Sequence, residues 1–254
     1  MEMVFIEIKR RMNYRTEVYF TFFASLVEIA VQIALWRYLY QNNNEMMNFM
    51  TVYVIYSSII KAFYSNRIFY ILTEKIQSGD FIIDLLKPVN IVWFSYLKSL
   101  GEIICQIILE GFPLLLLFST IVVKNTIWTN LGLALSVLLA GHIIFTLIYT
   151  IIGFSSFMFV ESWSLRRLMD DTIHFISGAM FPIAIFPDIL QKIAMVLPFR
   201  YMYDLPINLL VNQNLDEVIT HSDYIGIMLW IVILSIVLLV VYNNSVHHSV
   251  VQGG

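Results

Sequence analysis

Cysteine is almost absent from this sequence. The single cysteine, Cys105, lies within an apolar run, so neither an intrachain disulfide nor a cysteine-based metal site can form. Charge is also scarce, because Asp, Glu, Lys and Arg make up 13% of the 254 residues, about half the share of a soluble domain. With a net charge of -3, the chain lacks the basic surface that nucleic-acid binding requires.

The short patterns that mark common catalytic centres are missing as well. There is no H-E-x-x-H motif, no G-x-S-x-G motif and no cluster of His and Cys at metal-ligand spacing. The phosphate-binding pattern G-x-x-x-x-G-K-[ST] is also missing, so any ATP that drives this protein must be bound by another chain. No internal repeat is strong enough to indicate an inverted-repeat transporter.

Hydrophobic residues make up 59% of the chain, and its mean hydropathy is +0.78. These values predict an all-α, polytopic membrane protein that forms one domain over 1–254. A basic and apolar N-terminal segment within 1–18 predicts an interfacial helix. The apolar runs predict six spans, which we place at about 19–40, 47–72, 93–123, 131–160, 172–185 and 224–242.

Prolines interrupt the apolar region that follows the fifth span. They are Pro182, Pro187, Pro198 and Pro206, and a straight helix cannot accommodate all four. We therefore expect two short helices, at 187–197 and 201–210, within a re-entrant segment at 186–211. Irregular backbone at membrane depth is tolerated only where it is buried in protein or lines a cavity.

A short helix is expected within 73–90, between the second and third spans. Ser78 or Asp80 can cap its start, Gly79 loosens the preceding backbone, and Pro88 cannot continue it. Such a helix is too short to span a bilayer and too apolar to lie free in water. It therefore lies at the membrane surface, with or without a docked partner.

The distribution of Lys and Arg sets the orientation in the membrane. Basic residues gather in the N-terminal segment, around 73–90 and in the polar stretch at 161–171. We therefore expect the N-terminus, the short helix and the C-terminal tail to be cytoplasmic, and the proline-broken segment to be extracellular.

Three sets of polar residues lie inside predicted spans, where a charged group costs a few kcal/mol. Listed by span, they are Glu28 and Gln32; Lys98, Glu102, Gln106 and Glu110; and His142 with His174. Either they line a substrate path, or they pair between helices, as in Glu28 with Lys61 or Glu102 with Lys98. A proton relay is a third interpretation.

Taken together, these features resemble the permease subunit of a bacterial type-2 ATP-binding cassette exporter. The similarity rests on four pieces in order: G-D-F-I-I-D-L-L-K-P-V at 79–89, S-G-A-M-F-P at 177–182 followed by Phe186-Pro187, L-P-F-R-Y at 197–201 with Pro206, and the tail V-V-Q-G-G at 250–254. The resemblance implies six spans, a cytoplasmic coupling helix between the second and third, and extracellular re-entrant helices before the sixth.

The resemblance also assigns roles to residues. The coupling helix would dock on an ATPase through Asp80, Phe81, Ile82, Asp84, Leu85, Leu86 and Lys87. The candidate translocation path comprises Glu28, Gln32, Glu102, Gln106 and Glu110. This chain would bind no cofactor or metal, and ATP and Mg would be held by the partner ATPase.

The implied assembly has two ATPase copies and a second permease chain, identical or homologous, in the bacterial plasma membrane. It would export an amphipathic drug, peptide or lipid. Two alternatives stay open on sequence alone: an ion- or proton-coupled carrier that uses Glu28, Glu102 and Glu110, and a membrane scaffold or immunity protein without transport.

Overall fold

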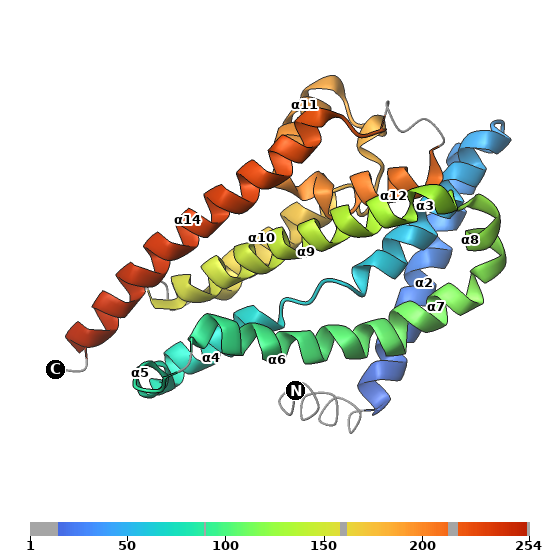
Figure 1. The fold of residues 1–254 in the computed structure, drawn as a ribbon. Helices are drawn as coiled ribbons and strands as arrows, with labels where there is room; N and C mark the ends of the chain where they lie inside the picture. Colours follow the sequence, from blue (N-terminus) through green and yellow to red (C-terminus); the bar gives the residue numbers. More distant parts are fainter. Residues whose placement is uncertain (1–14, 89, 158–161, 213–217, 253–254) are drawn as a thin grey trace.

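The computed structural model describes residues 15–88, 90–157, 162–212 and 218–252 (Figure 1). All regular secondary structure in these residues is helical, which confirms the predicted all-α class. The predicted interfacial helix at 1–18 falls almost entirely outside the described residues, because the first helix, α2 (Arg15–Leu39), begins near its end.

Four stretches within the described residues are long and apolar enough to cross a membrane. They are Tyr19–Leu39, Ile91–Leu117, Trp128–Phe157 and His221–Val246. They match the first, third, fourth and sixth predicted spans and support a multi-pass membrane location. The last belongs to α14 (His221–Gln252), whose C-terminal end lies toward the same end of the molecule as α5 (Asp80–Leu85) in Figure 1.

The central helix of the fold is α9 (Leu131–Phe154), which packs against α4 (Arg67–Ser78), α12 (Asp204–Val211) and α14 (Figure 1). Glycines allow this close packing. A Cβ added at Gly153 would lie 3.0 Å from the Leu72 side chain, and one at Gly141 would lie 2.5 Å from the Tyr201 carbonyl oxygen. Small residues at such crossings let helix backbones approach closely in a membrane protein.

The prediction of one continuous second span is wrong. The helix α3 (Asn44–Lys61) ends at Lys61, and α4 begins after a short non-helical break at 62–66. Polar side chains stabilise this break, since the Tyr64 hydroxyl donates to the Met202 carbonyl at 2.7 Å and the Ser65 hydroxyl accepts from the Arg67 amide at 3.2 Å. Such bonds compete with the helical hydrogen bonds of the backbone.

The third predicted span is also not one regular helix. It comprises α6 (Ile91–Gln106), a π-helical turn (Ile107–Gly111), α7 (Phe112–Leu117) and α8 (Ser119–Asn125). Pro113 follows the π turn, and a proline both lacks an amide hydrogen and clashes with the turn before it. Gly111 lies close to α3, because a Cβ added there would be 3.0 Å from the Ala62 Cβ.

The predicted limits of the fifth span are wrong as well. The helix α10 (Ser162–Ile176) begins about ten residues before the expected start and includes most of the polar stretch that we expected to separate two spans. Two of its polar side chains pair with each other, since Arg166 forms an ion pair with Asp170 one turn further along α10, whereas Arg167 and Asp171 are exposed.

The proline-broken segment forms the two short helices expected from the sequence. They are α11 (Asp188–Val196) and α12, separated by a 3-10 turn (Pro198–Tyr201), and a further 3-10 turn (Ile183–Ile185) precedes them. The residues that precede this segment are held to α3 by hydrogen bonds from the Tyr53 hydroxyl to the Gly178 carbonyl and from the Ser57 hydroxyl to the Ala179 carbonyl, at 2.7 and 2.5 Å.

Candidate functional site

The short helix α5 leaves α4 through a sharp turn at Gly79. Gly79 has a φ of +80°, and its amide donates to the Ile76 carbonyl, which ends α4. Glycine adopts this left-handed conformation without steric cost. Neither Ser78 nor Asp80 is the N-cap as expected, because that position is Gly79 and no side chain caps it. The Ser78 hydroxyl instead donates to the Asp80 carboxylate at 2.9 Å and accepts from the Asp80 amide at 3.4 Å.

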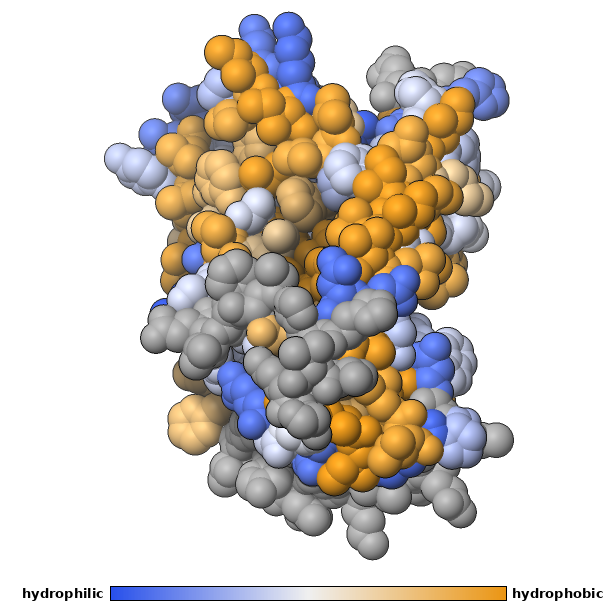
Figure 2. Space-filling model, turned by 90° about the vertical axis from the view of Figure 1, so that its left-hand side faces the viewer, coloured by the Kyte–Doolittle hydropathy of each residue, from blue (hydrophilic) through white to orange (hydrophobic). Residues whose placement is uncertain are grey.

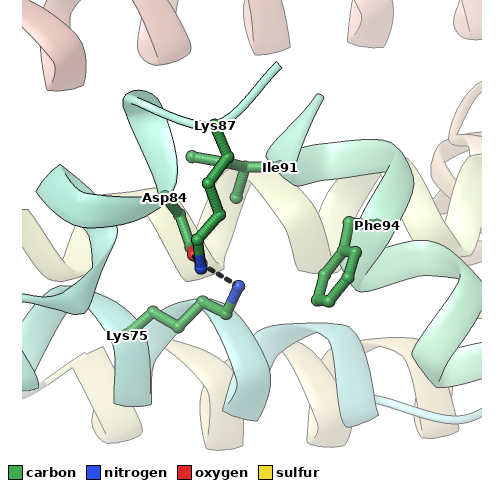
Figure 3. A pocket seen from close by; sticks show the side chains of 5 residues that line it. All are labelled: Lys75, Asp84, Lys87, Ile91 and Phe94. Atoms are coloured by element: carbon green, nitrogen blue, oxygen red, sulfur yellow. Dashed lines mark hydrogen bonds and ion pairs between the residues drawn. The ribbon is translucent and has the colours of Figure 1, made fainter. Parts of the chain in front are cut away.

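Ion pairs hold α5 against α4. The Asp84 carboxylate contacts both Lys75, on α4, and Lys87, which lies 2.7 Å away just beyond α5 (Figure 3). Partial burial of Asp84 acts to raise its pKa, but the hydrogen bonds and charges of the two lysines outweigh this effect and lower the pKa. Asp84 therefore stays ionised at neutral pH and is bonded on both sides.

The side chain of Phe81 points into the protein. It is 1% exposed and makes edge-to-face contacts with Phe154 and Phe157, with ring centroids 5.9 and 5.0 Å apart. Leu85 is half-buried against the same core. The sequence left open whether the apolar side chains of this helix anchor it to an ATPase or to its own spans, and these two residues pack against their own chain.

The surface of α5 that remains open is apolar. We define the docking face as Ile82, Ile83 and Leu86, which are 41%, 56% and 84% exposed. The exposed Asp80 and Lys87 are the charged members of the predicted coupling set. Viewed from the side that carries α14 and α5, the molecule is largely hydrophobic, with separate hydrophilic patches (Figure 2).

Acid is expected to loosen α5. The pKa of the Asp84 carboxyl group is lowered in the folded protein, so its ion pairs stabilise α5 fully when the pH is above the ordinary value of 3.8. This stabilisation is lost as the pH falls through the lowered pKa. Hydrogen exchange at 80–87, corrected for the intrinsic rate, should therefore be faster at pH 3 than at pH 6, by at most about fivefold for such a pair. Asp84→Asn should abolish the difference, and equal protection of the wild type at both pH values would contradict it.

A polar cavity of about 300 Å³ lies among α2, the break at 62–66, the π turn, α9 and α10. Its lining includes Lys61, Tyr64, Gln106, Glu110, Asp170 and His174. Two members of the predicted path therefore line one cavity. Glu110 lies in the π turn and Gln106 directly precedes it. Such turns are frequent at functional sites.

Two further members of the predicted path lie beside this cavity in ion pairs. Glu28 pairs with Lys61 at 2.8 Å, as the pairing interpretation expected, and lies 3.9 Å from the His174 ring. Glu102 lies 3.5 Å from Arg67, so the alternative partner suggested for it, Lys98, is wrong. Lys98 instead lies over the Phe94 ring at 4.9 Å. The fifth member of the predicted path, Gln32, is half-buried on α2 and is not among the residues that line the cavity.

Sequence reasoning missed one pair in the cavity wall. Asp170 accepts a hydrogen bond from Tyr149 of α9 and pairs with Arg166, whose guanidinium lies 5.4 Å from the Tyr70 ring and 5.6 Å from the Trp163 ring. The pair joins α10 to α9 and α4. The sequence did contain a signal for this pair, because Arg166 and Asp170 have opposite charges and are four residues apart, the spacing of neighbours on one face of a helix. We had interpreted that stretch as a loop.

The two intramembrane histidines have different surroundings. His142 does not line the cavity but stacks on the ring of Tyr64, which does. Its Nδ1 is 3.1 Å from the Phe63 carbonyl oxygen and its Nε2 is 3.4 Å from the Tyr96 hydroxyl. His174 lines the cavity. Within the described part of the chain, no three His, Cys, Asp or Glu side chains lie close enough together to hold a metal ion.

Comparisons with known proteins identify the family. A family model described as "ABC-2 family transporter protein" matches residues 26–253, which is most of the chain. A search of curated proteins finds no significant match. The chain therefore belongs to the ABC-2 transporter family and is the membrane permease of an ATP-binding cassette transporter, which works with a separate ATP-binding subunit.

Proposed function

We propose that this permease exports an amphipathic substrate, a drug, peptide or lipid, by using ATP that is hydrolysed in a partner subunit docked on α5. The observation that carries this proposal is the docking face. A helix of six residues presents Ile82, Ile83 and Leu86 outward although its own core contact, Phe81, is already made. Apolar side chains exposed together on a short helix are typical of a protein interface.

The attachment of α5 suits it to transmit force. Phe81 and the Asp84 ion pairs fix α5 to α4 and α9, so a push on the docking face moves α4 as well. The other end of α4 begins at the break at 62–66, where Tyr64, Ser65 and Asn66 line the polar cavity. Movement of α4 would therefore change the cavity wall directly, without bending a continuous second span.

The cavity is suited to a substrate with both apolar and polar parts. One side is aromatic, since the Tyr64 ring lies 5.0 Å from Phe145 and 5.2 Å from Tyr203. The other side carries Gln106, Glu110 and Lys61. Because a cavity of about 300 Å³ is small for such a substrate, we propose that a second permease chain completes the path.

In this arrangement the permease has six spans, its termini and α5 are cytoplasmic, and the segment at 186–211 is extracellular. Two ATPase copies would contact the two permeases and hold ATP and Mg, while this chain would bind neither. The location would be the bacterial plasma membrane. The Lys and Arg distribution supports the proposed orientation, and membership of the ABC-2 family supports a partner ATPase.

Charge introduced on the docking face should abolish ATPase binding. In membranes that contain the permease and its cognate ATP-binding subunit, Ile83→Asp and Leu86→Asp should each reduce co-purification of the ATPase by tenfold or more, because a buried apolar contact would be replaced by an unpaired charge. The measurement is the ATPase-to-permease ratio after affinity purification in detergent.

The matched control is Ile189→Asp. Ile189 is 75% exposed on α11, which lies well away from α5 in Figure 1. It should leave the ratio unchanged, and the elution volume of each variant checks that the permease is folded. Phe81→Asp is unsuitable, because it would disrupt the core. Full ATPase retention in both α5 variants would rule out docking on this face.

A further inference from the structure

We propose that the recess between α4, α5 and the start of α6 binds the phosphate of an anionic phospholipid headgroup. The recess has a volume of about 60 Å³ and is lined by Lys75, Asp84, Lys87, Ile91 and Phe94. Figure 3 shows the two lysine ammonium groups at the Asp84 carboxylate, with the Phe94 ring on the other side of the space. This proposal depends on the proposed function only for the cytoplasmic location of α5.

Positive charge is in excess at this recess. Lys75 and Lys87 share one carboxylate, that of Asp84. Lys98 does not line the recess but adds a third ammonium group next to it, 4.9 Å from the centroid of the Phe94 ring, and it forms no ion pair with any carboxylate in the described part of the chain. Glu102, one turn beyond Lys98 on α6, is paired with Arg67. The described residues therefore place three lysines around the one carboxylate of Asp84, which leaves room for a ligand with one or two negative charges.

Phe94 contacts two of these cations. The Lys75 and Lys98 ammonium groups lie 4.7 and 4.9 Å from the centroid of its ring. Each contact is a cation–π interaction, which positions an ammonium group without neutralising its charge. Both ammonium groups therefore keep hydrogen-bond donors for an anion.

The depth of the recess points to a lipid headgroup as the anion. Lys98 lies seven residues into α6, roughly 10 Å along the helix axis. Its side chain extends back over Phe94, one turn nearer the start of α6, as lysines do when they reach from hydrocarbon toward the headgroup layer. Trp93 is 59% exposed at the same level, where tryptophans mark the membrane–water interface.

Binding there would have a consequence for α5. A phosphate shared by Lys75, Lys87 and Lys98 would join the last turn of α4, the middle of α6 and the segment just beyond α5. The C-terminal end of α5 would then be attached to the lipid surface, while its docking face stays exposed. Anionic lipid would in this way make α4, α5 and α6 move together.

The test measures which lipids remain bound to the purified full-length permease. The protein is reconstituted in nanodiscs of phosphatidylcholine and phosphatidylglycerol in equal amounts, extracted into detergent, and its retained lipids are quantified by mass spectrometry. The wild type should retain phosphatidylglycerol preferentially. Lys98→Gln and Lys87→Gln should each lower the ratio of phosphatidylglycerol to phosphatidylcholine by about fivefold, as expected for one lysine near an anionic surface.

Two controls separate the charge from the fold. Lys98→Arg keeps the charge and should retain most of the preference, whereas Lys192→Gln removes an exposed lysine from α11 and should change nothing. Equal lipid ratios in the wild type and Lys98→Gln would overturn the proposal. Thermal stabilisation by inorganic phosphate without any lipid preference would also overturn it, in favour of a soluble anion.

The outcome is independent of the ATPase experiment. If the wild type binds the ATPase fully but shows no preference for phosphatidylglycerol, only the assignment of the recess as a lipid site would be rejected. Conversely, a Leu86→Asp variant that loses the ATPase but keeps its lipid preference would leave the recess assignment intact. A preference abolished equally by Lys192→Gln would show a diffuse surface effect and would also contradict a defined site.

Discussion

Replacing Gly178 with alanine should destabilise the permease by about 3 kcal/mol. Gly178 has a φ of +86°, a conformation that costs other residues about 1–2 kcal/mol. The added Cβ would lie 2.7 Å from the Asp204 Cβ and 2.8 Å from the Tyr53 hydroxyl oxygen. Overpacking of this kind costs typically about 1–3 kcal/mol more. The measurement is the midpoint of thermal unfolding in detergent.

Two other glycines provide a graded comparison. Gly79 shares the positive φ but would place its Cβ in open space, so Gly79→Ala should cost only the backbone strain. Gly132→Ala, in α9, meets no atom within 4 Å and has ordinary backbone angles, so it should be neutral or slightly stabilising. Equal midpoints for Gly178→Ala and Gly132→Ala would contradict the close packing of the segment against α3.

Replacing Arg200 with methionine should cost about 3–5 kcal/mol. Arg200 and Asp223 form an ion pair at 3.0 Å in which the side chains are only 10% and 7% exposed. Removal of one partner leaves the other charge buried and uncompensated. Asp223 would keep its hydrogen bonds from the amide and hydroxyl of Thr220, both at 2.9 Å, but these cannot balance a full charge.

The double variant Arg200→Met with Asp223→Asn tests the cause of this loss. If the uncompensated charge is responsible, the double variant should be more stable than Arg200→Met alone, so the two changes should be strongly non-additive. Lys192→Met, at an exposed position of α11, should have no measurable effect. Additive losses in the double variant would mean that Arg200 contributes through packing rather than through its pair.

Both predictions concern the connection between the segment at 186–211 and the cavity. Asp204, which lies beside Gly178, accepts a hydrogen bond from the Ile183 amide at 3.1 Å, and the preceding residue, Tyr203, lines the cavity. The ring of Tyr201 contacts the arginine of the buried pair at 5.9 Å. The proline-broken segment is therefore part of the cavity wall, and losing its attachment should impair transport as well as stability.

Features that depend on local chemistry were predictable from the sequence. Gly79 and Pro88 bound the short helix because a left-handed glycine and a proline act on their own neighbours. Likewise, Pro187 and Pro198 predicted the limits of α11, since a proline interrupts a helix beyond its first turn, the position that Pro206 occupies in α12. The apolar runs were long enough to identify four spans.

The break in the second span was not predictable. It depends on a hydrogen bond from Tyr64 to Met202, which lies 138 residues away along the chain. The same limit applies to α10, whose polar residues are typical of a loop. In the structure, Asp170 of this helix is bonded to Tyr149, and Arg166 lies beside aromatic rings. A local pattern cannot show whether a polar side chain has a partner in another helix.

By itself, the sequence determined that this is a helical membrane protein and that its backbone turns at Gly79 and at Pro198. The tertiary structure alone decided which side of α5 is open and which intramembrane charges meet. Phe81 faces the core and Leu86 faces outward because α9 covers one side of α5. The first set of features depends on neighbours along the chain, whereas the second depends on contacts between helices that are distant in sequence.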